Sequence, residues 1–324
     1  MMSMREIVGE TRIARGQYWS HGLTLVDGCT EVSEGCRNCW AARMATRFDR
    51  GRGFAAGGKW TGKVELNPRA MSALEARSRT TRFQRPQVVC VWNDLLHRDI
   101  PAEHIDRLMR LMVFCSDVLL ILTKRPERLA EFVDHYSVRR AAETGRIWLG
   151  VTVESQKHAA RVLLLLTHWP GKKFVSVEPC LESVDLGSYV RSIDWVIVGG
   201  ETGPGAGPCH PEWVRLIRQR CLEAVVPFFF KGWGEWAPAF PQYGTDDIAV
   251  AEMDAEARLG REPRNTVCLE VDGSSLCGIE HGKYWCTGQP RPECRPWWLW
   301  RVGRKKAGRL LDGRTWDEFP EVRT

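Results

Sequence analysis

The sequence of 324 residues lacks the features that mark membrane and secreted proteins. No apolar run approaches the roughly 18 residues needed to cross a bilayer. The N-terminal segment MMSMREIVGETRIARG has no apolar stretch between a basic start and a small-residue cleavage site, so we expect no signal peptide. These absences predict a cytoplasmic protein without a membrane partner.

Internal repeats and low-complexity tracts are absent too, which excludes a repeat array. Hydrophobic residues make up 44% of the chain, enough for the core of one large α/β domain or of two ordinary domains. The chain contains twelve cysteines. In a reducing compartment this number indicates metal binding or plain burial rather than a disulfide framework.

The net charge of the chain is +6, and the basic residues are unevenly distributed. Eleven Lys or Arg but only three acidic residues fall between Arg43 and Arg85, and a second basic segment runs from Arg301 to Arg309. Such clusters attract polyanions, although either could simply be a solvated surface. The fifteen tryptophans favour nucleic acid as the partner because indoles stack on bases, while most of them are expected in the core.

Seven short apolar runs, each followed by polar residues, are typical of strands buried on both faces. They are LTLVDGC, VVCVWND, VLLILTKR, IWLGVTVE, KFVSVEP, DWVIVGGE and VPFFFKGWG. Segments with apolar residues at helical spacing, such as PAEHIDRLMRLMVFC and HPEWVRLIRQRCLEAV, lie between several of them. This alternation predicts α/β architecture, with a partial or complete parallel (β/α) barrel over residues 1–236.

The polar residues at the ends of these runs are functional candidates, because active sites of parallel barrels lie at the carboxyl ends of the strands. We expect them to converge on one mouth, although some could be helix caps or partners in loop salt bridges. They are Cys29, Asn93, Asp94, Lys124, Glu154, Glu178, Glu201 and Lys231.

Residues 237–324 have a different character and predict an irregular Cys/Trp-rich insertion followed by a basic tail that packs on the barrel. The part up to residue 266 has no strong periodicity and is rich in Pro, Gly, Asp and Glu. Four cysteines follow at C-x8-C-x8-C-x7-C spacing, without the tight pair of a zinc finger, and could bind zinc or a second cluster. They are Cys268, Cys277, Cys286 and Cys294.

The segment DGCTEVSEGCRNCW places Cys29, Cys36 and Cys39 at C-x6-C-x2-C spacing, with glycines that permit turns. Thiolates are soft ligands that suit iron–sulfur clusters or zinc. A closed zinc site needs a fourth ligand, for which His21 is a candidate. A four-iron, four-sulfur cluster held by three thiolates instead leaves one iron open for a cofactor or substrate. Three incidental cysteines are the remaining interpretation.

Several segments resemble a phage-encoded three-cysteine family, the gp-thirty-seven/gp-sixty-eight family. This family is a relative of the radical S-adenosylmethionine barrels. They cover most of the chain except residues 237–300. The segments are GCTEVSEGCRNCWAARM, WNDLLHRDIP, LTKRPERL, IWLGVTVES, FVSVEP, DWVIVGGETGPGAGPCHPEWVR, VPFFFKGWGEW and KKAGRLLDGRTWDEFP. The chain has Trp40, Ala41 and Ala42 where the family usually has Tyr-Ala-Glu, and Gly232 where it usually has Gln. These departures indicate a different substrate.

The resemblance implies a radical-S-adenosylmethionine-like TIM barrel in which Cys29, Cys36 and Cys39 hold a 4Fe-4S cluster. The open iron would then bind S-adenosylmethionine, and an electron donor such as flavodoxin or ferredoxin would be needed. We also expect catalytic residues and residues that bind the cofactor through its amine, ribose or carboxylate. The catalytic candidates are Lys124, Glu178 and Glu201, and the cofactor-binding candidates are Asn93, Glu154, Gly199, Gly200 and Glu201.

Three functions are compatible with these patterns. The first is a radical S-adenosylmethionine enzyme that modifies a nucleic-acid base, such as an isomerase of an amino-acid-decorated, hypermodified thymine in phage DNA, working in the host cytoplasm. The second is a non-catalytic nucleic-acid-binding protein with a structural iron–sulfur or zinc centre. The third is a barrel hydrolase that uses Glu154 and Glu178, and it ranks last because carboxylates at two strand ends are common.

Overall fold

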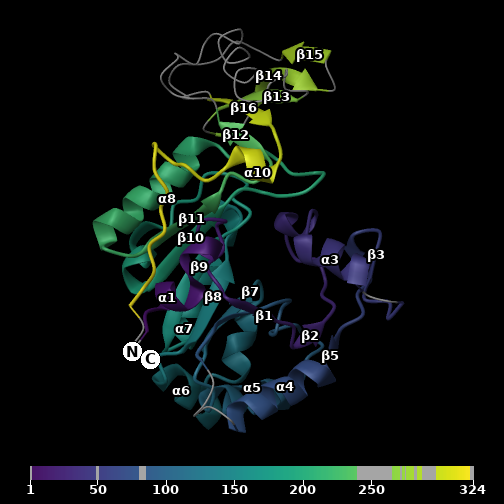
Figure 1. Cartoon of the computed structure of the whole chain (residues 1–324), viewed down its shortest axis with the longest axis vertical. Coiled ribbons are helices and arrows are strands. Elements are labelled where there is room, and N and C mark those ends of the chain that lie inside the picture. Colours follow the sequence, from purple (N-terminus) through teal and green to yellow (C-terminus); the bar gives the residue numbers. More distant parts are fainter. Residues whose placement is uncertain are drawn as a thin grey trace.

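The computed structural model describes residues 2–48, 51–79, 85–238, 265–270, 272–273, 275–280, 283–286 and 297–321. Its centre is a wholly parallel seven-stranded sheet, ordered β1-β6-β7-β8-β9-β10-β11, that curls into a half-barrel (Figure 1). The sequence predicted a partial or complete parallel barrel, and the partial form is confirmed. The strands are β1 (His21–Leu23), β6 (Val88–Val91), β7 (Val118–Thr123), β8 (Ile147–Thr152), β9 (Lys172–Val177), β10 (Trp195–Gly199) and β11 (Phe228–Gly232).

Six of the seven predicted strands coincide with strands of this sheet, and the first one differs. The run LTLVDGC does not form one strand, because β1 already ends at Leu23. The next residues, Val26–Asp27, form β2, which pairs antiparallel with β5 (Glu65–Leu66) outside the main sheet. The chain thus leaves the half-barrel a few residues before the first cysteine of the loop.

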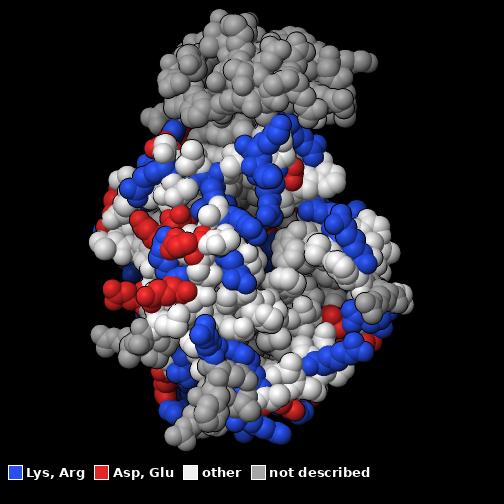
Figure 2. Space-filling view, in the orientation of Figure 1, with Lys and Arg blue, Asp and Glu red and all other residues white. Residues whose placement is uncertain are grey.

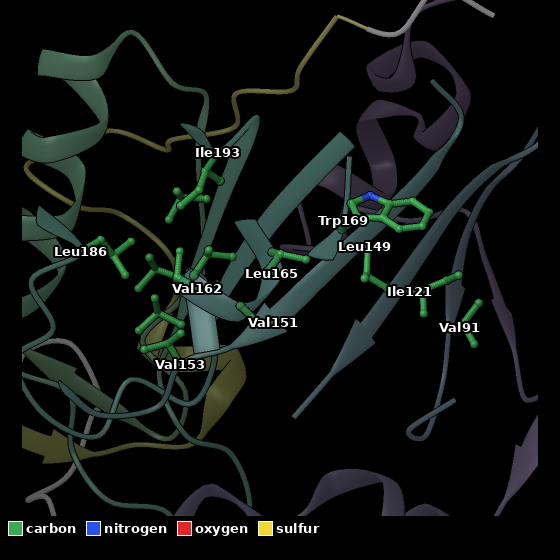
Figure 3. Close-up of a cluster of buried hydrophobic side chains, with 14 of the residues drawn as sticks. Val91, Ile121, Leu149, Val151, Val153, Val162, Leu165, Trp169, Leu186 and Ile193 are labelled. Atoms are coloured by element: carbon green, nitrogen blue, oxygen red, sulfur yellow. The ribbon is translucent and has the colours of Figure 1, made fainter. Parts of the chain in front are cut away.

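Helices cover one face of the sheet, as the alternation of strands and helices predicts. Side chains that alternate along the strands pack there against α7 and the segments that follow α7 and β9 (Figure 3). Examples labelled in Figure 3 are Val91, Ile121, Leu149, Val151, Val162, Leu165, Trp169 and Leu186. The helices are α4 (Pro68–Arg79), α5 (Ala102–Val113), α6 (Tyr136–Glu143), α7 (Ala160–His168) and α8 (Pro211–Ala224), with 3-10 turns η3 (Pro126–Glu131), η4 (Gln156–His158) and η5 (Gly187–Ser192).

The other face of the sheet lines the inside of the half-barrel, and a separate cluster of buried side chains fills it near the amino ends of the strands. The large members Trp148, Trp195 and Phe229 are at most 1% exposed. The N-terminal helices α1 (Met4–Val8) and α2 (Glu10–Ile13) add apolar side chains to the same cluster. This end of the half-barrel is therefore a packed core.

The C-terminal part contains a second sheet, which corrects the prediction of an irregular insertion. Its five strands are antiparallel and ordered β12-β16-β13-β14-β15. All residues of β13 and the first four of β16 are buried, so neither strand shows the alternation that would have revealed it. The strands are β12 (Trp236–Pro238), β13 (Thr266–Leu269), β14 (Ser275–Glu280), β15 (Lys283–Cys286) and β16 (Trp297–Arg301).

The tail that follows α10 (Arg304–Ala307) packs along β11, the last strand of the half-barrel. The Phe230 amide donates to the Trp316 carbonyl at 2.9 Å, and the Glu318 amide donates to the Phe228 carbonyl at 3.2 Å. These hydrogen bonds cover an edge of the sheet that would otherwise expose unpaired backbone groups.

The segment between β1 and β6 forms a small lobe beside the half-barrel (Figure 1). It contains η1 (Glu34–Cys36), α3 (Trp40–Phe48) and a hairpin of β3 (Ala55–Ala56) and β4 (Lys59–Trp60). Within the described ranges, no helix combines the length and the apolar character needed to cross a membrane.

Candidate active site

The cysteine loop, residues 28–39, lies directly on the carboxyl ends of the parallel strands. A Cβ atom added to Gly35 would be 2.7 Å from Glu154 Cγ and 3.1 Å from Pro179 Cδ, so a larger residue would push the loop off the strand ends of β8 and β9. Gly28 has a φ of +83° and lies against the Lys63 carbonyl, as its predicted role in a turn requires.

Arg125 holds the first part of the loop, and it is only 5% exposed. Its Nη2 donates to Thr30 Oγ1 at 2.6 Å and to the Thr30 carbonyl at 3.0 Å, while Nη1 donates to Asp94 Oδ2 at 2.7 Å and lies 3.8 Å from Cys29 Sγ. The buried His97 side chain contacts Thr30 Oγ1 at 2.8 Å from the other side. Burial and the nearby Arg125 lower the pKa of His97. Residues after β6 and β7 thus fix Thr30, next to the first cysteine.

Glu154, which follows β8 and is fully buried, holds the middle of the loop. It accepts hydrogen bonds from Ser33 Oγ at 2.5 Å, from Lys124 Nζ and from Arg161 Nη1 at 2.6 Å. Burial alone would raise the pKa of Glu154, but the two cations and Ser33 outweigh it and the pKa is lowered. The carboxylate is therefore ionised and fully engaged within the protein.

Two further loop residues, Glu34 and Asn38, fix the second half of the loop. Glu34 accepts from Ser155 Oγ at 2.5 Å and from His158 Nε2 at 3.1 Å, which docks η1 on the connection between β8 and α7. Asn38 Nδ2 donates to Glu201 Oε1 at 3.0 Å, after β10. Side chains that follow four different strands of the half-barrel thus hold the loop.

The three thiols of the loop are each half-buried and none forms a disulfide. Burial, together with Asp94, raises the pKa of Cys29 to about 11 against the opposing effect of Arg125. Lys124 Nζ lies 3.6 Å from Cys36 Sγ. Its positive charge outweighs the effect of burial, which would raise the pKa, so the pKa of Cys36 is lowered. The Cys39 amide donates to the Cys36 carbonyl at 3.2 Å, which places these two cysteines on one turn.

A second polar group lies at the carboxyl ends of β9 and β11. Lys231 Nζ, after β11, is 3.0 Å from Glu178 Oε1, after β9, and the two side chains are 32% and 15% exposed. The Tyr18 hydroxyl donates to Glu178 Oε2 at 3.4 Å, and the Lys231 ammonium lies over the rings of Tyr18 and Trp19. Burial and the neighbouring Glu178 raise the pKa of Tyr18, so its hydroxyl stays protonated. Both side chains of this ion pair thus remain partly accessible.

Several predicted site residues have roles within the protein that the sequence did not reveal. Asn93 Nδ2 donates to the Val26 carbonyl at 2.7 Å and so holds β2. A Cβ atom added to Gly199 would lie 2.7 Å from Glu178 Oε1, and one added to Gly200 would lie 2.1 Å from the Trp233 carbonyl oxygen. The absence of a side chain at these two glycines therefore lets other parts of the same chain pack closely against them. A role for them in binding a cofactor remains a prediction.

The donor set of the loop can be tested against the predicted metal groups. Among the described residues, no three His, Cys, Asp or Glu side chains are close enough together to hold a single metal ion. The loop offers three half-buried thiols outside any disulfide, which is the ligand type of iron–sulfur clusters, and a cluster at this loop remains a prediction. Lys124 and Arg125 lie beside Cys36 and Cys29, where they would compensate the negative charge of thiolates.

The second cysteine group lies in the antiparallel sheet. Cys268, Cys277 and Cys286 occupy directly paired positions of β13, β14 and β15. Cys294 lies outside the described residues. The paired positions bring three of the four cysteines into one row across the sheet, and metal binding there remains a prediction.

Sequence reasoning missed Thr30, Ser33 and Asn38, through which the loop is held. It also missed Arg161, which pairs with Glu154, and Tyr18, which contacts Glu178. One signal was present, because Arg161 interrupts the otherwise apolar run of α7. A charged residue on such a helix indicates a buried ionic partner. Tyr18 precedes the first strand in a segment without periodicity, so no pattern pointed to it.

Comparison with known proteins gives one result. No curated protein and no solved structure matches the chain. The model of a family described as "Protein of unknown function (DUF5131)" matches residues 15–320. The match spans the half-barrel, the cysteine loop and the tail along β11. The chain therefore belongs to the DUF5131 family.

Proposed function

We propose that this protein is a radical S-adenosylmethionine iron–sulfur enzyme that modifies a base of a nucleic acid. One observation carries the proposal: a loop with three half-buried thiols is held by polar side chains across the carboxyl edge of a parallel half-barrel. This edge is where enzymes with parallel barrels place their active sites.

Cys29, Cys36 and Cys39 would hold a 4Fe-4S cluster with one iron left open for S-adenosylmethionine. When bound, the reduced cluster would supply one electron to S-adenosylmethionine and break a carbon–sulfur bond of its sulfonium. The products would be methionine and a carbon radical, which would take a hydrogen atom from a substrate. Lys124 and Arg125 compensate the charge of the thiolates, and Arg125 lies between Cys29 and the buried Asp94. A flavodoxin or ferredoxin is the expected electron donor.

Glu154 acts as a positioning residue, because it fixes Ser33 and Lys124 from below the loop. Glu178 and Lys231 have a different role, since both remain partly exposed. They offer an acceptor and a donor to polar groups of the cofactor or substrate, such as an amine and a carboxylate. Tyr18 and Trp19 support Lys231 through their ring faces.

Nucleic acid is the proposed substrate class because of the charge around this edge. Figure 2 shows Lys and Arg side chains over the α3 lobe and over the region of α10, on either side of a hollow. A polyanion would be attracted to such a surface. A base within a duplex would have to be flipped out to reach the half-barrel.

The test is a cofactor-cleavage assay on the full chain, reconstituted anaerobically with iron and sulfide. The proposal predicts release of 5′-deoxyadenosine from S-adenosylmethionine under reducing conditions, and loss of that release in Cys36→Ala. The matched control is Cys221→Ala, which removes a fully buried thiol on α8, away from the loop. Mass analysis of nucleosides after incubation with phage-type modified DNA then identifies the product.

Other results would contradict the proposal. Stoichiometric zinc without cofactor cleavage would favour the non-catalytic nucleic-acid-binding protein. An activity that survives Cys36→Ala but is lost in Glu178→Gln would favour the hydrolase.

A further inference from the structure

Helix α3 presents a line of large apolar side chains to solvent. Trp40, Met44 and Phe48 are 43%, 39% and 63% exposed. Their spacing of four residues puts them on one side of the helix, one above the other. Single exposed apolar residues are ordinary, but a contiguous line of them marks an interaction site.

This line begins at the candidate active site. Trp40 directly follows Cys39. Its ring meets the ring of Trp92, the residue after β6, edge to face at 5.3 Å between centroids. From there the line leads outward along α3 to Phe48. Eight residues of helix rise about 12 Å, which is roughly the length of three or four nucleotides at about 3.4 Å each.

Exposed cations flank the line. Arg37, Arg47 and Lys59 are exposed, and none of them makes an ion pair with another described residue. The three exposed cations of α10, Arg304, Lys305 and Lys306, are likewise without an ion pair in the described ranges. Exposed cations of this kind can contact an external polyanion.

The loop after β10 brings these two basic segments to the same face, although about 260 residues separate them in sequence. Arg43 of α3 donates to the Thr202 carbonyl at 2.8 Å. Arg301, which precedes α10, donates to the Gly203 carbonyl at 3.0 Å and also contacts the Pro204 carbonyl. Figure 2 shows the resulting blue surfaces on either side of the hollow.

We infer that the α3 line and its flanking cations form a binding surface for an unpaired stretch of a polynucleotide. Trp40 and Phe48 stack on bases about three or four nucleotides apart, and the cations of α3 and α10 contact phosphates. Bases must be unpaired to offer their faces to such side chains, and stacking of this kind tolerates any sequence. The surface extends the proposed function, because it would deliver a strand rather than a free nucleotide to the half-barrel.

Two other partners fit this surface less well. Helices that lie in a membrane surface are commonly 20–30 residues long, whereas α3 has 9 residues and its first aromatic ring already packs on Trp92. An acidic protein partner would satisfy the charge, but it would not require aromatic rings aligned at helical spacing beside a catalytic edge. Both become outcomes of the test.

The experiment measures binding of fluorescein-labelled 12-nucleotide DNA and RNA strands, and of the DNA duplex, to the full chain by fluorescence anisotropy. Wild type should bind a single strand at least about tenfold more tightly than the duplex, with an affinity that falls steeply with salt. Phe48→Ala should weaken single-strand binding by at least about fivefold, and Lys305→Glu combined with Lys306→Glu should reduce the salt dependence.

The control is Tyr136→Ala, which removes a 76% exposed aromatic ring from α6, on the helical layer. It should bind like wild type. Because Phe48 is 63% exposed, its removal leaves the core intact, and thermal unfolding of the variant verifies this. Equal affinity of wild type and Phe48→Ala would overturn the inference. The inference would also be overturned if the protein bound anionic vesicles or an acidic flavodoxin but bound neither DNA nor RNA strands.

The same assay on Cys36→Ala separates this inference from the proposed function on which it builds. If Cys36→Ala and wild type bind strands equally but wild type cleaves no S-adenosylmethionine, the surface stands and the enzymatic proposal falls. If wild type cleaves the cofactor but neither strand nor duplex binds, the enzymatic proposal stands and the surface falls.

Discussion

The two ends of the strands in the half-barrel differ sharply in chemistry. At their amino ends, inside the half-barrel, large apolar side chains such as Trp148, Trp195 and Phe229 pack with the N-terminal helices. At the carboxyl ends, the same strands lead into buried charged residues such as Asp94 and Glu154. One end is a conventional core, and the other end holds a loop through ion pairs.

The difference shows which end is built for stability and which for positioning. Buried charges are costly, and well-packed apolar residues are often at least as stabilising in their place. Here the charges contact backbone and side chains of the cysteine loop at defined points, such as Thr30 and Ser33. We infer that they are used to fix the loop in one position.

The apolar end can be weakened by Trp195→Ala, for which we expect the largest effect. Trp195 is fully buried and contacts the rings of Tyr18, Trp148, Phe229 and Phe319. Removing it should lower the free energy of unfolding by about 3–5 kcal/mol, measured by urea denaturation. The control Phe114→Ala, at a 67% exposed site, should change it by less than about 0.5 kcal/mol. Equal losses in both variants would contradict the core described for this end.

The carboxyl end can be tested with Glu154→Gln, which keeps the shape of the side chain and removes its charge. Lys124 and Arg161 would lose their shared buried partner, so we expect a loss of about 3 kcal/mol in the free energy of unfolding. The loop should also bind less iron after reconstitution, because Ser33 and Lys124 lose their fixed positions.

The matched control is Glu131→Gln, since Glu131 pairs with Arg128 at a 48% exposed position. Such a pair contributes at most about 1 kcal/mol. If Glu154→Gln were no more destabilising than Glu131→Gln and retained full iron content, the positioning role of Glu154 would be refuted.

A smaller effect is expected where the tail meets α8. Asp312 pairs with Arg215 and Arg218, and these cations outweigh burial and lower the pKa of Asp312. Since Asp312 is 32% exposed, solvent screening limits the stabilisation to about 1 kcal/mol. A lowered folded-state pKa stabilises the protein above the unfolded pKa, near 3.8, and this contribution is lost as pH falls below it.

Asp312→Asn should therefore be less stable than wild type at pH 7, and the difference should shrink as pH falls from about 4 to 3. Asparagine tolerates the positive φ of 54° at this position, so the backbone is not strained by the change. Unfolding curves of both proteins across this pH range provide the measurement. A difference that stays constant with pH would show that the charge of Asp312 is not its cause.

The sequence predicted the half-barrel well because its strands are buried on both faces and read as uninterrupted apolar runs, such as VLLIL in β7. It also located the polar strand ends, since parallel topology places them at one edge. It did not predict the antiparallel sheet, whose short strands lie in a segment without clear periodicity.

The partners of the site residues could not be read from the sequence either. Glu154 and Glu201 were expected to bind a cofactor, but in the structure they hold Ser33 and Asn38 of the loop. These pairs join residues more than 100 positions apart. Only the three-dimensional arrangement shows whether a carboxylate at a strand end faces a ligand or another part of the chain.

The most direct test of the central claim is the iron and acid-labile sulfide content of the anaerobically reconstituted full chain. Wild type and Cys221→Ala should each bind about four irons and four sulfides, with the electron paramagnetic resonance signal of a reduced cluster. Cys36→Ala should lose both the iron and the signal. A wild-type protein that takes up one zinc ion and no iron, or a Cys36→Ala variant with undiminished iron, would contradict a cluster held by the cysteine loop.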